Sequence, residues 1–133
     1  MKPLIINNKE SKFFKILFDK DKNTFIIEGN SLLENATSFF TPIHEWLSEY
    51  QAQPNTENIL HLSLNYYNTS SSKHLLKIFL YFKNIMEQGN DVLVKWYGAE
   101  ETEYIEEAEV YESLAKIPFE FIEEIPDFSK FFK

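Results

Sequence analysis

Residues 59–96 contain the pattern that most constrains the fold, because a strand pattern, a helix pattern and a second strand pattern follow one another directly. Residues 59–64 alternate apolar and polar side chains, as a half-buried strand does. An amphipathic run then covers residues 70–88, and Gly89 favours the end of a helix. Residues 91–96 are apolar enough for an interior strand. Since a strand–helix–strand unit joins parallel strands through a right-handed crossover, the segment predicts an α/β fold.

The residues before this unit predict a hairpin and another helix. Residues 13–19 and 24–28 are rich in aromatic and β-branched side chains, and the polar residues between them have the length of a hairpin turn. Residues 36–50 carry apolar side chains at spacings of three and four, which is typical of a helix. Because Pro42 lies inside this window, we expect the regular helix to begin near Thr41, with that residue as its cap.

The C-terminal part of the chain adds one helix and one strand to the prediction. Residues 102–116 are amphipathic, and one stripe of that helix carries Tyr104, Ala108, Tyr111 and Ala115. Residues 119–122 can form the last strand, and residues 124–133 form a C-terminal tail. The order β-β-α-β-α-β-α-β predicts a mixed sheet with an N-terminal hairpin and packed helices, formed by a single domain over residues 1–133.

Composition excludes several classes of function. The chain has 133 residues and no cysteine, which rules out disulfides, thiolate catalysis and cysteine-ligated metals. Its formal net charge of -8 argues against a nucleic-acid partner, because no basic stripe is available for a phosphate backbone. No apolar run approaches the length that crosses a membrane, and no N-terminal targeting segment follows Met1. We therefore expect a cytoplasmic protein with neither a nucleic-acid nor a membrane partner.

Four consecutive hydroxyl side chains stand where the strand over residues 59–64 gives way to the helix over residues 70–88: Thr69, Ser70, Ser71 and Ser72. A helix N-terminus carries unpaired N–H groups and a partial positive charge, which attract anions. Thr69 or Ser70 can be the N-cap, which contributes about 1 kcal/mol. A cap needs only one hydroxyl, however, and Thr69 can also be a site where phosphate is attached and removed.

The helix over residues 70–88 has two apolar stripes. The first is expected to face the sheet and consists of Leu75, Phe79, Phe82 and Met86. The second has the same spacing and consists of His74, Ile78, Tyr81 and Ile85. This second stripe either packs on a neighbouring helix, which we favour, or forms a surface for a partner beside Thr69.

No group of residues predicts catalysis or metal binding. Seven glutamates between positions 100 and 112 have no basic residue and no histidine among them, so a solvated helix face is favoured over a metal site. His44, His61 and His74 would have to serve a small hydrolase, yet the chain has no nucleophile elbow and, with three glycines, no glycine-rich phosphate loop. We expect no catalytic residues, no metal and no cofactor.

Several short segments carry a resemblance to a known family. The sharpest is Leu-Asn-Tyr-Tyr-Asn-Thr-Ser-Ser-Ser-Lys at residues 64–73. The others are Ser-Leu-Leu-Glu-Asn-Ala at 31–36, Phe-Phe-Thr-Pro-Ile at 39–43, Val-Leu-Val-Lys-Trp-Tyr at 92–97 and Ile-Pro-Phe at 117–119. In this order they resemble the SiaC family of bacterial regulatory phosphoproteins over residues 25–123. Residues 96–111 depart from the family pattern, and nothing is carried over from them.

The resemblance implies a fold like the STAS domains of anti-sigma factor antagonists and a function without catalysis. It implies that a partner kinase of the GHKL ATPase type phosphorylates Thr69 and that a PP2C-like phosphatase removes the phosphate. Ser70 and Ser71 are fallback acceptors. The unphosphorylated form would bind and activate a target, a diguanylate cyclase in the best-known members.

The partner-binding surface that follows from this resemblance consists of Asn68, Thr69, Ser70, Lys73 and His74. One alternative from a different functional class stays open. In that alternative, the chain is a constitutive scaffold for protein interactions, and Thr69 is only a helix cap.

Overall fold

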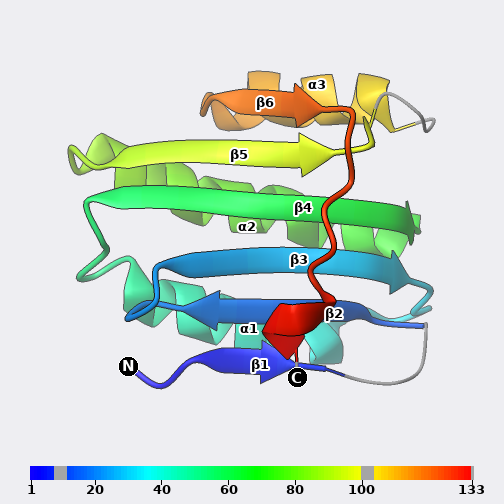
Figure 1. Ribbon diagram of the computed structural model, residues 1–133, viewed down its shortest axis with the longest axis horizontal. Helices are drawn as coiled ribbons and strands as arrows, with labels where there is room; N and C mark the ends of the chain where they lie inside the picture. Colours follow the sequence, from blue (N-terminus) through cyan, green and yellow to red (C-terminus); the bar gives the residue numbers. More distant parts are fainter. Residues whose placement is uncertain (8–11, 100–103, 133) are drawn as a thin grey trace.

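The described residues form one mixed sheet in which strands that are neighbours in sequence are also neighbours in space (Figure 1). The structure is a computed structural model and describes residues 1–7, 12–99 and 104–132. The first three strands pair antiparallel, and every later pair is parallel. In chain order the strands are β1 (Leu4–Ile6), β2 (Phe14–Asp19), β3 (Thr24–Ser31), β4 (Glu57–Tyr67), β5 (Asp91–Tyr97) and β6 (Phe119–Ile122).

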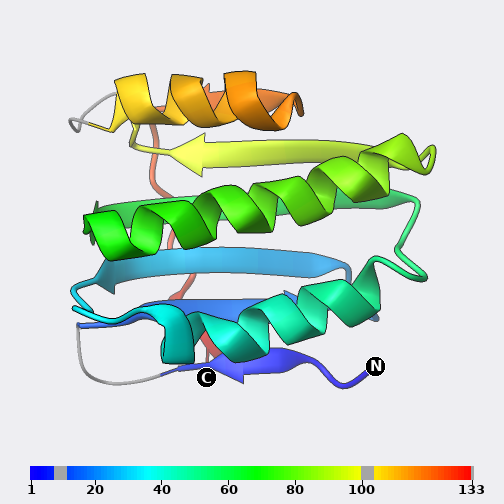
Figure 2. The same ribbon diagram turned by 180° about the vertical axis from the view of Figure 1, so that it is seen from behind.

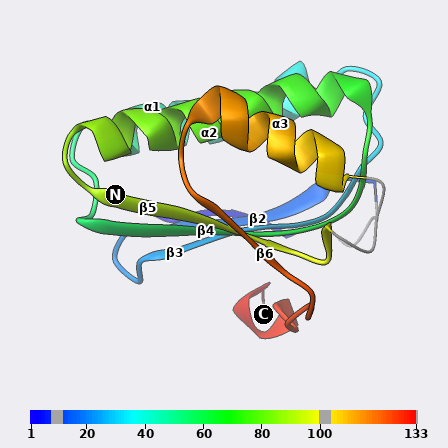
Figure 3. The same ribbon diagram turned by 90° about the horizontal axis from the view of Figure 1, so that it is seen from above.

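Three helices cover one face of the sheet: α1 (Thr37–Tyr50), α2 (Thr69–Glu87) and α3 (Ile105–Ala115). Figures 2 and 3 show them side by side on that face. Each helix connects one parallel strand to the next, and each step across the sheet goes in the same direction. Right-handed crossovers that step in one direction return every helix to the same face. The prediction of an α/β mixed sheet with an N-terminal hairpin is confirmed, whereas the likeness to STAS domains stays a prediction.

Two predictions for the N-terminal half were wrong in detail. The strand β1 was missed, because three residues carry too little alternation to be recognised. The helix α1 begins at Thr37 rather than near Thr41, so Pro42 lies inside it. Proline removes one backbone hydrogen bond at that position. The helix tolerates this loss because the carbonyl left without a partner belongs to Ser38, which is exposed to water.

The core lies between the sheet and the helices, and aromatic rings of both layers contact one another in it. Phe25 of β3 contacts rings of both α1 and α2, with centroid distances of 5.2 Å to Tyr50 and 5.8 Å to Phe82. Leu75, Phe79 and Phe82 have no exposed surface, which confirms that their stripe of α2 faces the sheet. The other stripe of α2 packs against α1, as favoured above.

The helix α3 is shorter than predicted. It covers Ile105–Ala115, and Lys116 ends it in the left-handed conformation at φ 56°. The predicted start at Thr102 lies outside the described residues, as do Glu100, Glu101 and Glu103 of the acidic run. The predicted stripe is confirmed, because its four residues are all buried: Tyr104, Ala108, Tyr111 and Ala115. None of the helices in the described residues is long and apolar enough to cross a membrane.

No α-helix of the described residues lies on the opposite face of the sheet, and the C-terminal tail crosses that face instead (Figures 1 and 3). The tail ends in a short 3-10 helix, η2 (Ser129–Phe132). Phe128 and Phe132 are buried there against Leu17 and Ile26. The tail passes so close to Gly98, which has φ 72°, that a Cβ at this position would lie 2.9 Å from Cδ1 of Ile125.

Candidate functional site

The segment around Thr69 lies where β4 ends and α2 begins, beside the end of β3. Asn68 is the N-cap of α2, since its side chain accepts a hydrogen bond from the backbone N–H of Ser71 at 3.2 Å. Its Nδ2 donates to the carbonyl of Leu33 at 2.7 Å, which ties the cap to the loop after β3. The prediction that Thr69 or Ser70 caps this helix was therefore wrong by one or two positions. The amide of Asn68 does both at once, because its oxygen accepts from the helix and its nitrogen donates to that loop.

The two serines after Thr69 hold the start of α2 in place. The Ser70 hydroxyl donates to the carbonyl of Leu33 at 2.7 Å. The Ser71 hydroxyl lies 2.6 Å from that of Ser31, and both serines are fully buried. Burial corrects the prediction of Ser71 as a fallback acceptor, because an enzyme cannot reach its oxygen while this turn is folded. Ser70 is half-buried and already hydrogen-bonded.

Thr69 differs from these neighbours in exposure and in hydrogen bonding. It is the first residue of α2 and is exposed, and its hydroxyl makes no hydrogen bond within the described part of the chain. Ser72, on the same turn, donates its hydroxyl proton to the carbonyl of Thr69 at 3.1 Å. Among the four consecutive hydroxyl residues, Thr69 therefore presents a free hydroxyl at the positive end of a helix.

The two neighbouring positions should differ sharply in their effect on stability. We expect Asn68→Ala to lower the free energy of unfolding by about 1–2 kcal/mol, because it removes the cap and leaves the Leu33 carbonyl with one donor fewer. Thr69→Ala should change it by less than about 0.5 kcal/mol, because no hydrogen bond is lost. Urea unfolding of the two variants checks this. An equal loss in both would show that Thr69 also caps the helix.

The two remaining residues of the predicted partner surface lie in different environments. Lys73 is exposed one turn after Thr69, on the same side of α2. His74 is buried between α1 and α2, where its ring stacks on Phe40 with a centroid distance of 4.7 Å. Burial leaves little of His74 accessible to a partner, and its role in the partner surface stays a prediction. Ile78, one turn later on the same apolar stripe, is also fully buried. The stripe therefore predicted the environment of His74 correctly.

His74 forms a pair with His44 that sequence reasoning missed. Nε2 of His44 lies 2.9 Å from Nδ1 of His74, so one ring donates and the other accepts. The two other ring nitrogens of the pair are buried and have no partner in the described residues. Burial, helped by Lys77, lowers the pKa of His44 to about 4. Burial also lowers the pKa of His74, with Lys73 and Lys77 adding to the effect.

The histidine pair should make folding sensitive to mild acid. The unfolded chain binds a proton at His44 as the pH falls below the ordinary pKa of 6.5, whereas the folded chain binds it only near pH 4. Stability is therefore full above pH 6.5 and declines below it. We expect a loss of about 1–2 kcal/mol between pH 7.5 and pH 5, after allowance for the partial exposure of His44.

Urea unfolding at several pH values tests the histidine pair. His44→Gln should flatten the pH dependence between pH 7.5 and pH 5, whereas Ser48→Ala, on the exposed side of the same helix, should keep the dependence of the unchanged chain. An unchanged slope in His44→Gln would show that the pair does not control this range. The slope is the readout, because the substitution also removes a hydrogen bond.

A polar cavity of about 220 Å³ adjoins Thr69 and is lined also by Tyr67, Asn68, Ser72 and Glu107. Glu107 comes from α3, where it accepts a hydrogen bond from the hydroxyl of Tyr111 at 2.8 Å. The same hydroxyl lies 3.1 Å from the carbonyl of Ser72, so its proton is shared between two acceptors. Glu107 is thus half-buried in a hydrogen-bond network. The prediction that it belongs to a solvated helix face was wrong for this residue. Sequence reasoning did not connect it to Thr69, because the topology brings the two elements together.

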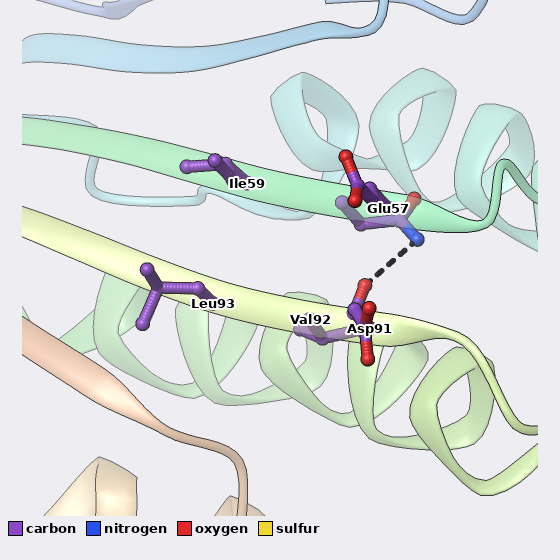
Figure 4. A pocket seen from close by; sticks show the side chains of 6 residues that line it. Glu57, Ile59, Asp91, Val92 and Leu93 are labelled. Carbon is purple, nitrogen blue, oxygen red and sulfur yellow. Dashed lines mark hydrogen bonds between the residues drawn. The ribbon is translucent and has the colours of Figure 1, made fainter.

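A second cavity, of about 260 Å³, lies on the open face of the sheet at the beginning of β4 and β5. Figure 4 shows Ile59 and Leu93 on these neighbouring strands, with helices behind them. This cavity is at the opposite end of β4 from Thr69, a separation of roughly 30 Å along the strand. The described residues contain no cluster that could hold a metal ion.

His61, the third histidine, lies on the open face of the sheet, where its Nδ1 is 2.8 Å from the hydroxyl of Tyr97. The sheet therefore separates it from His44 and His74, which lie in the helix layer. The three histidines cannot act on one substrate in this arrangement.

The family comparison assigns the chain to a class of proteins described as regulatory phosphoproteins. The chain belongs to the SiaC family, because the model of SiaC family regulatory phosphoproteins matches residues 7–124. This span contains strands β2 to β6, the three helices and the segment around Thr69, whereas β1 and most of the C-terminal tail lie outside it. No curated protein matches the chain.

Solved structures agree with this family. The crystal structure of apo-SiaC from Pseudomonas aeruginosa is 24% identical with a TM-score of 0.82, and the match covers 92% of this chain and 100% of that one. A second structure contains the diguanylate cyclase SiaD in complex with its activator SiaC, from the same organism. That match is 25% identical with a TM-score of 0.79, and it covers 90% of this chain and 98% of the other.

Proposed function

We propose that the chain is a non-catalytic switch protein that is phosphorylated reversibly on Thr69 and binds a diguanylate cyclase when unphosphorylated. The observation that carries this proposal is the free, exposed hydroxyl of Thr69, placed between side chains that are already hydrogen-bonded. Membership of a family of regulatory phosphoproteins supports it, and so does the solved complex of a SiaC with the cyclase that it activates.

The proposed cycle needs two partner enzymes. A kinase of the GHKL ATPase type transfers the γ-phosphoryl group of ATP: the bond from phosphorus to Oγ1 of Thr69 forms, the bond to the β-phosphate oxygen breaks, and the hydroxyl proton leaves. A PP2C-like phosphatase then adds water to phosphorus and releases Oγ1 with a proton. Since the kinase consumes ATP, we place the cycle in the cytoplasm. The chain itself supplies only the acceptor.

Phosphate at this position changes the surface more than the fold. A helix N-terminus tolerates a phosphate, because the unpaired N–H groups and the helix dipole stabilise negative charge. The surface around Thr69 includes its chain neighbours Asn68 and Ser70 and, one turn along α2, the exposed Lys73. A partner that covers this patch would meet a neutral hydroxyl in one state and a strongly hydrated dianion in the other.

The competing interpretation is a constitutive scaffold in which Thr69 only caps α2. It is less favoured, because Asn68 already caps this helix and the Thr69 hydroxyl has no hydrogen bond in the described residues. A scaffold would need no free hydroxyl at this position. The two interpretations differ in whether the partner recognises a modified Thr69.

Phosphopeptide mapping after treatment with the cognate kinase and ATP tests the proposal. We expect one phosphate per chain, on Thr69, and no phosphate on Thr69→Ala. Ser72→Ala is the matched control, because Ser72 is a hydroxyl residue of the same turn, and this variant should be phosphorylated like the unchanged chain. Phosphate found only outside residues 69–72, or complete phosphorylation of Thr69→Ala, would leave the scaffold interpretation standing.

A further inference from the structure

The cavity beside Thr69 is lined by a single carboxylate in the described part of the chain. Glu107 reaches it from α3, while Thr69 and Ser72 reach it from the first turn of α2. The carboxylate is held by the hydroxyl of Tyr111, which also lies within hydrogen-bond distance of the Ser72 carbonyl. Glu107, Tyr111 and Ser72 therefore form one polar link between α3 and the start of α2.

Tyr67 also lines this cavity, and its hydroxyl is the second feature of the site. The side chain is 4% exposed, and its hydroxyl has no hydrogen-bond partner in the described residues. Burial raises the pKa of Tyr67, and the nearby Tyr111 and Glu107 raise it further. The Tyr67 hydroxyl is therefore a buried donor close to Glu107 and Tyr111 that makes no hydrogen bond of normal geometry to the described residues.

A phosphate on Thr69 would enter the field of Glu107. The phosphate carries a charge of about −1.5 to −2 at neutral pH and three strong acceptor oxygens. The repulsion between it and a carboxylate lining the same cavity is weakly screened, because the cavity is partly enclosed. The hydroxyls of Tyr67 and Tyr111, in contrast, are donors of the kind that phosphate oxygens accept.

We propose that Glu107 senses the phosphate on Thr69: phosphorylation expels the carboxylate from the cavity, the Tyr67 and Tyr111 hydroxyls turn to the phosphate, and α3 loosens from α2. This inference rests on the proposed function and adds the route by which the modification is transmitted within the chain. Phosphorylation of Thr69 then changes α3 as well as the start of α2. A partner that binds α3 can therefore distinguish the two forms without contacting the phosphate.

Hydrogen exchange of the full chain tests the sensor. Phosphothreonine is incorporated at position 69 by genetic encoding, so that no kinase is needed, and protection of the Ile105–Ala115 amides is compared with the unmodified chain. We expect phosphorylation to reduce this protection about tenfold or more. In Glu107→Gln the reduction should be less than about threefold, because the amide keeps the shape without the charge. Glu109→Gln, exposed on the same helix, should behave like the unchanged chain.

Two outcomes would overturn the inference. Unchanged protection of α3 after phosphorylation would mean that the phosphate turns to solvent or to Lys73 and leaves Glu107 in place. An equal loss in Glu107→Gln and in the unchanged chain would mean that charge repulsion is not the cause. Neither result depends on a kinase, so failure of the sensor is distinguishable from failure of the kinase to modify Thr69.

Discussion

Phosphorylation of Thr69 is expected to weaken binding to the proposed cyclase target by about 100-fold or more. A partner that covers this helix start would have to strip water from a dianion, and no basic side chain lies closer along the helix than Lys73, one turn away. Desolvation of an unpaired charge costs several kcal/mol, which corresponds to at least two orders of magnitude in affinity. Calorimetric titration of the cyclase with the two forms measures the difference.

Three variants frame this measurement. Thr69→Ala should bind as tightly as the unphosphorylated chain and should stay bound in the presence of kinase and ATP. Thr69→Glu should weaken binding less than phosphate does, because a carboxylate has one charge and fewer acceptor oxygens. Ser72→Ala should follow the unchanged chain in both states. Equal affinity of the phosphorylated and unphosphorylated chains would contradict the switch, whatever the mapping shows.

Loss of the two buried phenylalanines of the tail is expected to have the largest effect on stability outside the main core. We expect the double variant Phe128→Ala with Phe132→Ala to lower the free energy of unfolding by about 3–5 kcal/mol. Both side chains are 6% exposed, and they cover Leu17 and Ile26 on a face that no main-layer helix protects. Their removal would lose the free energy gained by burying these two side chains, and it would also expose apolar side chains of the sheet to water.

Contacts at both ends of the tail hold this region against the sheet. The ring of Phe128 lies 5.6 Å from that of Tyr97 and 5.9 Å from that of His61, and Nδ2 of Asn7 donates to the carbonyl of Phe132. Phe131→Ala is the matched control, because its side chain is 41% exposed, and it should cost less than about 1 kcal/mol. A double variant as stable as this control would show that the tail does not contribute to the folded state.

The fold could be predicted from the sequence because hydrophobic periodicity is strong in the long elements. Residues 59–64 alternate, residues 91–96 are strongly apolar, and residues 70–88 repeat at three and four. The right-handed crossover rule then leaves few arrangements. The details that were missed depend on side chains that act across elements. Whether Asn68 or Thr69 caps α2 depends on the Leu33 carbonyl, which belongs to a different loop.

The candidate site was predictable only in part, for a related physical reason. Thr69 stands in a local motif, and a motif can be recognised in a single segment. Glu107 and the pairing of His44 with His74 join residues that are 30 or more positions apart, and only the packing of neighbouring helices brings them together. Periodicity predicts which face a residue occupies, but it does not predict which residue it meets.

Asn68, Ser70 and Ser71 fasten the backbone around Thr69 to the end of β3 and to the loop that follows it. An enzyme that modifies Thr69 without unwinding this turn must therefore recognise a folded surface rather than an extended peptide. The same residues in a nascent or denatured chain would not present that surface. Phosphorylation would then select chains that have finished folding, so that misfolded copies stay outside the signalling cycle.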